Sequence, residues 1–261
     1  MSDGPLARKR SLLFDLDGCI WFGDVLADGA AELVRDLRAS GRTVGFVTNI
    51  SSGRARQIAE KLTRLGIPTT PDEVLMPVEA LAEHPRMRAR PTTFVIGQSE
   101  LRTTVAELTD VTHDPDRAEL VLLSRDPQLR YDDLADALQP LLRGAPLLAL
   151  NVDLRVPVAD GRILPGAGAL ATALASAAGI EVEVVGKPSR FFLDTALRRF
   201  GVDRDEAVMV GDTLDSDIAG GRAAGLTTVH VGGDLRTLRD PAPQPDLSLP
   251  GVSGLRGLLG L

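Results

Sequence analysis

Cysteine is almost absent from the chain, and its scarcity excludes several kinds of site. Cys19 is the only cysteine among 261 residues, so neither an intramolecular disulfide nor a zinc site of several thiolates can form. The three histidines, His84, His113 and His230, lie far apart in the sequence, which disfavours a metal site built from histidines. Because a chain without disulfides fits a reducing compartment, we expect a cytoplasmic protein.

Long apolar runs are also missing. No run approaches the roughly 20 apolar residues that a transmembrane helix needs. Residues 1–10 are polar and basic, and no apolar segment typical of a signal peptide follows them. We therefore expect a protein that has no membrane partner.

Positive charge is in deficit, with 29 lysine and arginine residues against 36 aspartate and glutamate residues and a formal net charge of −7. Such a surface repels nucleic-acid backbones, so we expect no nucleic-acid partner, although a local site could still bind a small phosphorylated ligand. Lysine is especially rare, since Lys9, Lys61 and Lys187 are the only three. A lysine where the chain otherwise uses arginine is of interest, although the base composition of the gene explains this bias equally well.

Hydrophobic residues make up 44% of the chain and charged residues 25%, which is typical of a globular protein with a packed core. Short apolar runs alternate with helical patterns, and this alternation predicts an α/β fold with a doubly wound, mostly parallel, Rossmann-like sheet. The predicted strands are 11–15, 43–48, 93–97, 119–124, 147–151, 181–186, 207–212 and 227–232. The predicted helices are 29–40, 53–65, 99–108, 131–142, 166–178, 189–200 and 215–224.

The middle third of the chain differs from its two ends. Its strands end in fewer chemically capable side chains, and it contains a hairpin signal at 157–161 and a proline- and arginine-rich stretch at 84–91. We interpret 81–180 as an inserted α/β domain, and 1–80 together with 181–261 as the core domain that surrounds it.

Two aspartates follow the first predicted strand. Gly18 permits a sharp turn that would bring the carboxylates of Asp15 and Asp17 to one side. Carboxylates so close repel each other unless a cation lies between them or one of them is protonated. A turn rich in aspartate but without function has the same pattern, so this pair alone leaves both interpretations open.

Further aspartates follow the seventh predicted strand. Mg²⁺ prefers oxygen ligands, usually a few carboxylates with waters and a phosphate. Asp15 and Asp212 could supply such ligands, together with the backbone carbonyl of Asp17. Asp217 stands at the start of a predicted helix, where capping is the alternative to a functional role.

Polar groups follow two more strands. Lys187 could neutralise a carboxylate nucleophile or a phosphate oxygen, although a solvated loop lysine would show the same pattern. Thr48 and Asn49 follow the second predicted strand, and Ser51 and Ser52 come before a predicted helix. Donors near a helix N-terminus favour an anion, and the alternative is that Ser51 or Ser52 caps the helix. The combined set of groups suits phosphoryl transfer through an aspartyl phosphate.

Taken in order, these segments resemble the four motifs of the haloacid dehalogenase-like (HAD) phosphatases. The motif segments are FDLDG at 14–18, VTN at 47–49, GKP at 186–188 and GDTLDSD at 211–217. LPGAGAL at 164–170 and GGRAAGL at 220–226 are similar to segments of the NagD-like and 4-nitrophenylphosphatase-like subgroup, which has a large C2-type cap. The resemblance covers about residues 10–260.

The resemblance implies a role for each motif residue. Asp15 would attack the phosphorus and become phosphorylated. Asp17 would protonate the leaving group and then activate water, and its backbone carbonyl would bind Mg²⁺ beside Asp15. The resemblance thus implies a Mg²⁺-dependent phosphomonoester hydrolase that acts on a small phosphorylated metabolite.

The remaining motif residues would hold the phosphoryl group and the metal. Thr48, Asn49 and Lys187 would contact the substrate, Asp212 would bind Mg²⁺, and Asp217 would support the metal shell or Lys187. The cap would select the leaving group, and a homodimer through the cap is expected from relatives.

The chain departs from the family pattern at two places. Ile50 stands where the family often has a second asparagine, and Asn151-Val152-Asp153 stands where it often has Asn-Pro-Asp. The second change alters the expected shape of the loop at the edge of the cap. Beside the motif turn, we expect Trp21 and Cys19 to serve in packing.

Three alternatives remain for the function. A carbon–halogen hydrolase of the same fold needs neither the acid at Asp17 nor a metal ligand at Asp212, so both residues argue against it. A catalytically silent regulatory protein would not need the full set of chemical residues. A dinucleotide-dependent oxidoreductase would carry a Gly-x-Gly-x-x-Gly turn after its first strand, and this turn is missing.

Overall fold

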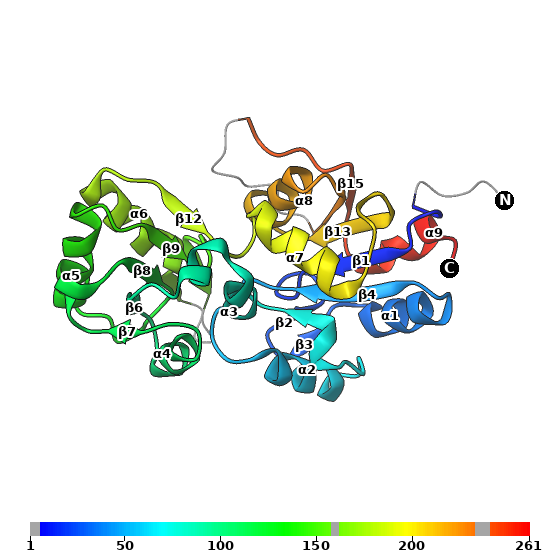
Figure 1. Cartoon of the computed structure of the whole chain (residues 1–261). Coiled ribbons are helices and arrows are strands. Elements are labelled where there is room, and N and C mark those ends of the chain that lie inside the picture. The colour runs from blue at the N-terminus through cyan, green and yellow to red at the C-terminus, as the bar shows by residue number, and fades with distance from the viewer. Residues whose placement is uncertain (1–5, 158–161, 233–240) are drawn as a thin grey trace. The chain divides into compact units, whose positions relative to one another are not determined.

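The structure is a computed structural model that describes residues 6–157, 162–232 and 241–261 (Figure 1). The chain forms two compact units. Unit 1 comprises the chain up to Thr48, then Ala55–Leu75 and Lys187–Leu261, and unit 2 comprises Asn49–Arg54 and Met76–Gly186. The predicted boundaries, with 81–180 as the inserted domain, remain a prediction. Within the described residues, no helix combines the length and the apolar character that crossing a membrane requires.

Unit 1 is built on a six-stranded sheet in which all neighbouring strands run parallel. The central strand β1 (Ser11–Phe14) lies between β13 (Ala207–Gly211) and β4 (Thr43–Val47). Of the two neighbours of β1, β4 is the next strand of this sheet along the chain, whereas β13 comes only after unit 2. Outside these three lie β5 (Val74–Leu75) beside β4, and β14 (Thr227–Val231) followed by β15 (Leu247–Leu249) beside β13.

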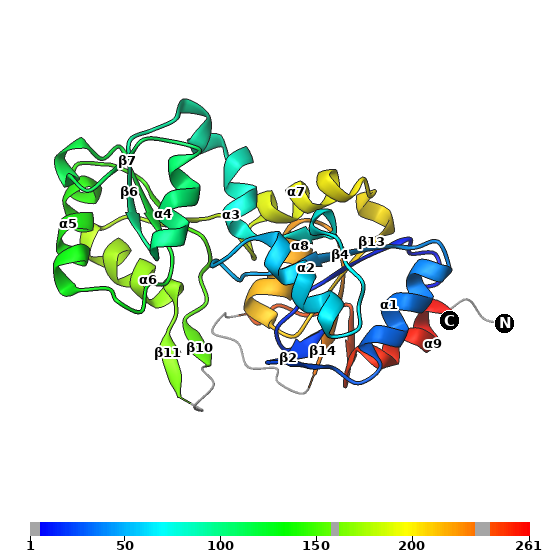
Figure 2. The same ribbon diagram turned by 90° about the horizontal axis from the view of Figure 1, so that it is seen from below.

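Helices cover both faces of this sheet (Figure 1). One face carries α1 (Ala30–Ala39) and α2 (Ala55–Arg64), and the other carries α7 (Arg190–Phe200) and α8 (Ala219–Ala223). This split follows from right-handed crossovers that leave β1 and β13 in opposite directions. In both views α9 (Leu255–Leu259) lies beside α1 (Figures 1 and 2), and Arg256 and Asp36 form an ion pair between these two helices.

Unit 2 has its own parallel sheet of five strands, in the order β12-β9-β8-β6-β7. Figure 2 also shows the antiparallel hairpin of β10 (Arg155–Pro157) and β11 (Ile163–Pro165). The strands of the sheet are β6 (Thr93–Ile96), β7 (Val111–Thr112), β8 (Leu120–Leu123), β9 (Leu147–Ala149) and β12 (Val182–Val184). The helices are α3 (Pro77–Ala80), α4 (Ser99–Ala106), α5 (Tyr131–Leu142) and α6 (Ala167–Ala178).

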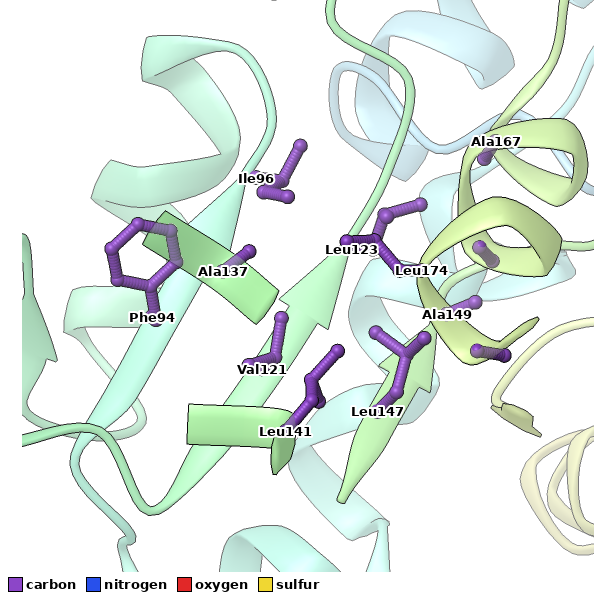
Figure 3. Packing of buried hydrophobic residues seen from close by; sticks show 12 residues of the cluster. Phe94, Ile96, Val121, Leu123, Ala137, Leu141, Leu147, Ala149, Ala167 and Leu174 are labelled. Atoms are coloured by element: carbon purple, nitrogen blue, oxygen red, sulfur yellow. The ribbon is translucent and has the colours of Figure 1, made fainter. Parts of the chain in front are cut away.

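The core of unit 2 lies between this sheet and two helices (Figure 3). Every second strand residue points toward the helices, as in Val121 and Leu123 of β8, because successive side chains of a strand alternate between its two faces. The helix α6 contributes mainly alanines, among them Ala167 and Ala171, and small side chains let a helix pack closely. The result is a continuous apolar layer that holds the ends of β6, β8 and β9 in fixed positions.

All eight predicted strands and the seven predicted helices are present, with bounds that differ by a few residues. The predicted strand 181–186, which we placed with 181–261 in the core domain, is present as β12 and pairs with β9 in the sheet of unit 2. The predicted helix 215–224 begins instead as a π-helical turn, Leu214–Ile218, followed by α8. The predicted turn at 157–161 lies outside the described residues except for Pro157.

Short elements were not predicted from the sequence. They include the hairpin of β2 (Trp21–Phe22) and β3 (Val25–Leu26), the two-residue strands β5 and β7, the edge strand β15, and the helices α3 and α9. The hairpin signal at 157–161 is confirmed, because β10 and β11 pair in antiparallel register on either side of it. The 3₁₀ turns are Pro71–Glu73, Leu81–Glu83, Pro85–Ala89, Pro115–Arg117, Arg204–Glu206 and Val252–Gly254. These elements are too short to show a periodic pattern.

Candidate active site

Two neighbouring strands of unit 1 place carboxylates at the same edge of the sheet. Asp15 follows β1 and Asp212 follows β13, and these strands are paired in parallel register. The amide of Asp15 continues the ladder by donating to the carbonyl of Val210 at 2.8 Å. Asp15 is thereby fixed at the carboxyl end of the central strand, where open α/β sheets bind their ligands.

Lys187 is the charged group at the centre of this edge. Lys187 is the first residue of the last segment of unit 1 and lies three residues before α7. Its side chain is 1% exposed. Its ammonium forms a hydrogen-bonded ion pair with Asp15 Oδ1. It also donates to the backbone carbonyl of Val47 at 2.9 Å and lies 2.7 Å from Asp217 Oδ1. Three oxygens thus surround a group that has three N–H donors.

Asp217 is held by the π-helical turn Leu214–Ile218. Its Oδ2 accepts a hydrogen bond from the amide of Thr213 at 3.0 Å, and its own amide donates to the carbonyl of Thr213 at 2.9 Å. The side chain lies directly over Gly211, where any Cβ would overlap its carboxyl group. The extra residue in the turn therefore carries Asp217 back over the strand end and toward Lys187.

Asp212 is partly buried beside the turn that follows β1. Gly18 adopts a φ of +83°, and a Cβ at this position would overlap the carboxyl group of Asp212. Glycine is needed here both for the backbone conformation and for this close approach. On the other side, His230 Nε2 donates to the backbone carbonyl of Asp212 at 2.9 Å.

Burial and like charge shape the electrostatics of the cluster. Burial raises the pKa of Asp15 above its ordinary value, Asp217 and Asp212 add to this rise, and Lys187 opposes it. Burial and the charge of Asp217 raise the pKa of Asp212 to about 6. Burial alone would lower the pKa of Lys187, but Asp15 and Asp217 outweigh this effect and raise it. The ammonium therefore stays charged.

The donor set fits a divalent cation. One carboxylate oxygen each from Asp15, Asp212 and Asp217 lies within 4.8 Å of the other two. Three carboxylates face a single ammonium, so two negative charges remain uncompensated when all are ionised. Oxygen donors of this kind suit a hard cation such as Mg²⁺, and a cation would remove the repulsion that raises the pKa of Asp212.

Asp17 lies two residues beyond Asp15 and points differently. Its side chain is exposed, and it is not one of the three carboxylates that lie together. Its Oδ1 accepts a hydrogen bond from the indole nitrogen of Trp21 at 2.7 Å. The turn therefore separates the two carboxylates, so that one enters the charged cluster and the other stays open to solvent.

The two residues after β4 belong to different units. Thr48 is buried in unit 1, where its amide donates to the carbonyl of Leu75 at 3.2 Å. Asn49 belongs to unit 2, and its side-chain amide donates to Asp153 Oδ1 at 3.2 Å. The carbonyl of Asn49 accepts from Asn151 Nδ2 at 2.8 Å. The structure thus describes Asp15, Lys187, Asp212 and Asp217 as one cluster, and it describes Asn49 only within unit 2.

Sequence reasoning missed three of these contacts. Trp21 was expected to pack, and it does so, but it also binds Asp17. His230 belongs to no motif, although a histidine within a predicted buried strand is a detectable signal. Asn151 and Asp153 were noted only as a departure from a family pattern, yet they hold Asn49.

Comparisons with known proteins agree with the fold and with the family that the sequence resembles. The family model of the haloacid dehalogenase-like hydrolases matches residues 12–109, and a HAD-hydrolase-like model matches residues 184–255. The chain is 35% identical to human glycerol-3-phosphate phosphatase, over 90% of this chain and 82% of the relative. It is 32% identical to acid sugar phosphatase of Staphylococcus aureus, over 90% and 91%. The solved 4-nitrophenylphosphatase of Thermotoga maritima superposes with a TM-score of 0.85 at 27% identity, over 97% of this chain and 98% of that one.

Proposed function

The chain belongs to the haloacid dehalogenase-like hydrolases and is a phosphatase of that family, and from this premise we propose a mechanism for its own residues. In this proposal the protein hydrolyses phosphomonoesters of small metabolites through a phosphorylated Asp15, with Mg²⁺ as its cofactor. The observation that carries the proposal is the buried ion pair of Lys187 with Asp15, flanked by Asp212 and Asp217.

The first step transfers the phosphoryl group to Asp15. A carboxylate oxygen of Asp15 attacks the phosphorus, and the bond from phosphorus to the leaving-group oxygen breaks. Asp17 in its acid form gives a proton to that oxygen, so an alcohol leaves rather than an alkoxide. Asp17 suits this task because it is exposed while Asp15 is buried.

The second step releases phosphate and restores both aspartates. Asp17, now a carboxylate, takes a proton from water, and the water oxygen attacks the phosphorus. The bond between phosphorus and Asp15 breaks, so Asp15 regains its carboxylate and inorganic phosphate forms. The proton that Asp17 gave away in the first step is thus recovered from water, and the cycle balances.

The surrounding residues have supporting roles in this proposal. Lys187 holds Asp15 in its reactive position, and Asp217 holds Lys187. Thr48 and Asn49 contact the phosphoryl oxygens. Asp15, Asp212 and the backbone carbonyl of Asp17 would hold Mg²⁺, whose positive charge favours the ionised carboxylates and offsets the charge of the phosphoryl oxygens.

We assign the choice of leaving group to unit 2 as the cap of the enzyme, and we propose a cytoplasmic enzyme that forms a homodimer through this cap. The names of the relatives suggest the first substrates to try: glycerol 3-phosphate, sugar phosphates and 4-nitrophenyl phosphate. The breadth of these names is the reason to test a panel rather than a single compound.

The test is phosphate release from this panel with Mg²⁺ and with EDTA. We expect metal-dependent release, with one natural phosphomonoester turned over far more efficiently than the others. Asp15→Asn is the matched control, because an amide of the same shape is a poor nucleophile. Substantial turnover by Asp15→Asn, or undiminished release in EDTA, would contradict the proposal, and halide release from chlorinated acids would favour the dehalogenase alternative.

A further inference from the structure

We propose that Trp21 is a positioning residue for the acid–base step: its indole N–H fixes Oδ1 of Asp17, so that Oδ2 is the oxygen that passes the proton to the leaving group. This inference rests on the proposed function, because it assigns an atom and a support to the acid proposed there. It differs from the packing role that the sequence alone suggests for Trp21.

The hydrogen bond between the two residues is short, and its donor belongs to a buried ring. Trp21 Nε1 lies 2.7 Å from Asp17 Oδ1, a distance typical of a hydrogen bond to a charged acceptor. Trp21 is 0% exposed, so its ring cannot turn freely. A buried indole normally needs a partner for its N–H, and here that partner is the proposed acid.

The backbone holds both residues on the same tight turn. The amide of Trp21 donates to the carbonyl of Leu16 at 3.0 Å, and the amide of Gly18 donates to the carbonyl of Trp21 at 2.9 Å. The residues on both sides of Asp17 are therefore bonded to the backbone of Trp21. The indole ring and the carboxyl group are therefore attached to the same hydrogen-bonded turn, which fixes the direction in which the side chain of Asp17 points.

The chemistry of the donor then distinguishes the two carboxyl oxygens. An indole nitrogen can only donate a hydrogen bond, so Oδ1 must act as an acceptor. A proton on Oδ1 would point at the indole N–H, and the acid form of Asp17 therefore carries its proton on Oδ2.

Lys61 contacts the face of the Trp21 ring. Its ammonium lies 4.3 Å from the centre of the Trp21 ring and pairs with Asp24 at 3.3 Å. A cation over an indole face is attracted to the ring and draws electron density from it, which strengthens the N–H as a donor. This assigns a task to one of only three lysines in the chain.

The decisive experiment compares leaving groups. Trp21→Phe keeps an aromatic ring but removes the N–H. We expect kcat/KM for an alkyl phosphate to fall about tenfold, while kcat/KM for 4-nitrophenyl phosphate, whose leaving group needs little protonation, changes little. An equal loss for both substrates would mean a merely structural role and would overturn the inference.

A second variant keeps the test valid if Trp21→Phe folds poorly. Trp21 is the only tryptophan, so growth of a tryptophan auxotroph on β-(3-benzothienyl)alanine replaces this residue alone with a ring of the same size that lacks the N–H. We expect the same selective loss for the alkyl phosphate, and wild-type activity on both substrates would contradict the inference.

Asp17→Asn separates a failure of this inference from a failure of the proposed function. If Asp17→Asn lowers kcat/KM, which reports the steps up to departure of the leaving group, equally for both substrates, Asp17 is not the acid and the proposed mechanism fails. If Asp17→Asn is selective for the alkyl phosphate but both tryptophan replacements are not, only the inference fails. In Asp17→Asn we also expect the emission of the single tryptophan to shift, because its acceptor loses its charge, and unchanged emission would count against the contact.

Discussion

The ammonium of Lys187 is enclosed by oxygens of Asp15, Asp217 and Val47. This geometry gives it a structural task besides its proposed catalytic one, because each carboxylate near it would be buried without compensation if it were lost. Lysine also suits the site sterically, since a compact ammonium fits among three oxygens where a planar guanidinium would not.

Replacing Lys187 should therefore damage both activity and stability. In Lys187→Met we expect no measurable turnover and an unfolding free energy lower by about 3–5 kcal/mol, the usual result of breaking a buried ion pair. Thermal unfolding and phosphate release check the two effects. Lys9→Met is the matched control, because the ammonium of Lys9 makes an exposed contact to the backbone carbonyl of Asp205. A similar loss of stability in that control would refute the explanation.

The raised pKa of Asp212 has a consequence for the metal-free protein. The folded-state pKa is about 6 against an ordinary value of 3.8, so the folded protein binds more protons than the unfolded chain between these values. The unfolding free energy contributed by Asp212 must then fall as pH rises from about 4 to about 6, and it stays lower above that range. Asp212 therefore destabilises the metal-free protein at neutral pH.

Asp212→Asn tests this directly. In EDTA at pH 7.5 we expect the variant to melt about 2–4 °C above the wild type, and at pH 4 we expect the difference to vanish. Mg²⁺ at pH 7.5 should raise the melting temperature of the wild type and leave that of the variant nearly unchanged. A variant that is less stable than the wild type in EDTA, or that keeps the full shift with Mg²⁺, would show that the charge of Asp212 is not the cause.

Single residues of the site were predictable where a strand end and a chemical group coincide. Asp15 and Asp212 follow short apolar runs that are typical of buried strands. Because the carboxyl ends of parallel strands lie at one edge of a sheet, the alternating pattern predicts that these two residues share an edge. The bond from Trp21 to Asp17 was not predictable, because it depends on how a six-residue hairpin folds back on itself. No periodicity in so short a segment carries that information.

Among the elements, the segment Asn49–Arg54 is the most unusual, because it belongs by its contacts to unit 2 while its neighbours on both sides belong to unit 1. The carboxyl ends of β8 and β9 hold it. Asn151 donates to the carbonyl of Asn49 at 2.8 Å, and Ser124 Oγ bonds Ser51 Oγ at 2.8 Å. A proposed phosphate contact is thus positioned by residues of unit 2.

Asn151→Ala should accordingly change substrate binding. Without its side chain, the backbone at Asn49 loses a hydrogen bond, and we expect KM for a phosphomonoester to rise about tenfold, equivalent to the roughly 1–2 kcal/mol of one buried hydrogen bond, while kcat changes less. Ser124→Ala is the control, because it removes a bond two residues further from Asn49 and should have a smaller effect. If kcat falls and KM does not change, Asn151 does not act through substrate binding.

The long elements of the fold were predictable and the short ones were not. Strands such as 43–47 and helices such as 131–142 carry enough residues to show their period, whereas β5 and β7 have two residues each. The assignment of 182–184 to a sheet could not come from the sequence either. Its alternation of valine and glutamate fits a strand in either unit, and only its pairing with β9 decides.

At the scale of the whole molecule, the chain passes between the two units at four peptide bonds, after residues 48, 54, 75 and 186. The central strand β1 pairs on one side with β4, which follows soon after it, and on the other side with β13, in the register Ser11 to Ala207. All of unit 2 lies between these two partners in the sequence.

This order of segments has a consequence during synthesis on the ribosome. Residues 76–186 emerge together, so unit 2 can bury most of its apolar layer while β1 still has an open edge. Asp15 is among the first residues made, and Lys187, Asp212 and Asp217 are among the last third. A nascent chain that stops anywhere within unit 2 therefore contains none of the charged cluster except Asp15, and the site assembles only when the polypeptide is nearly complete.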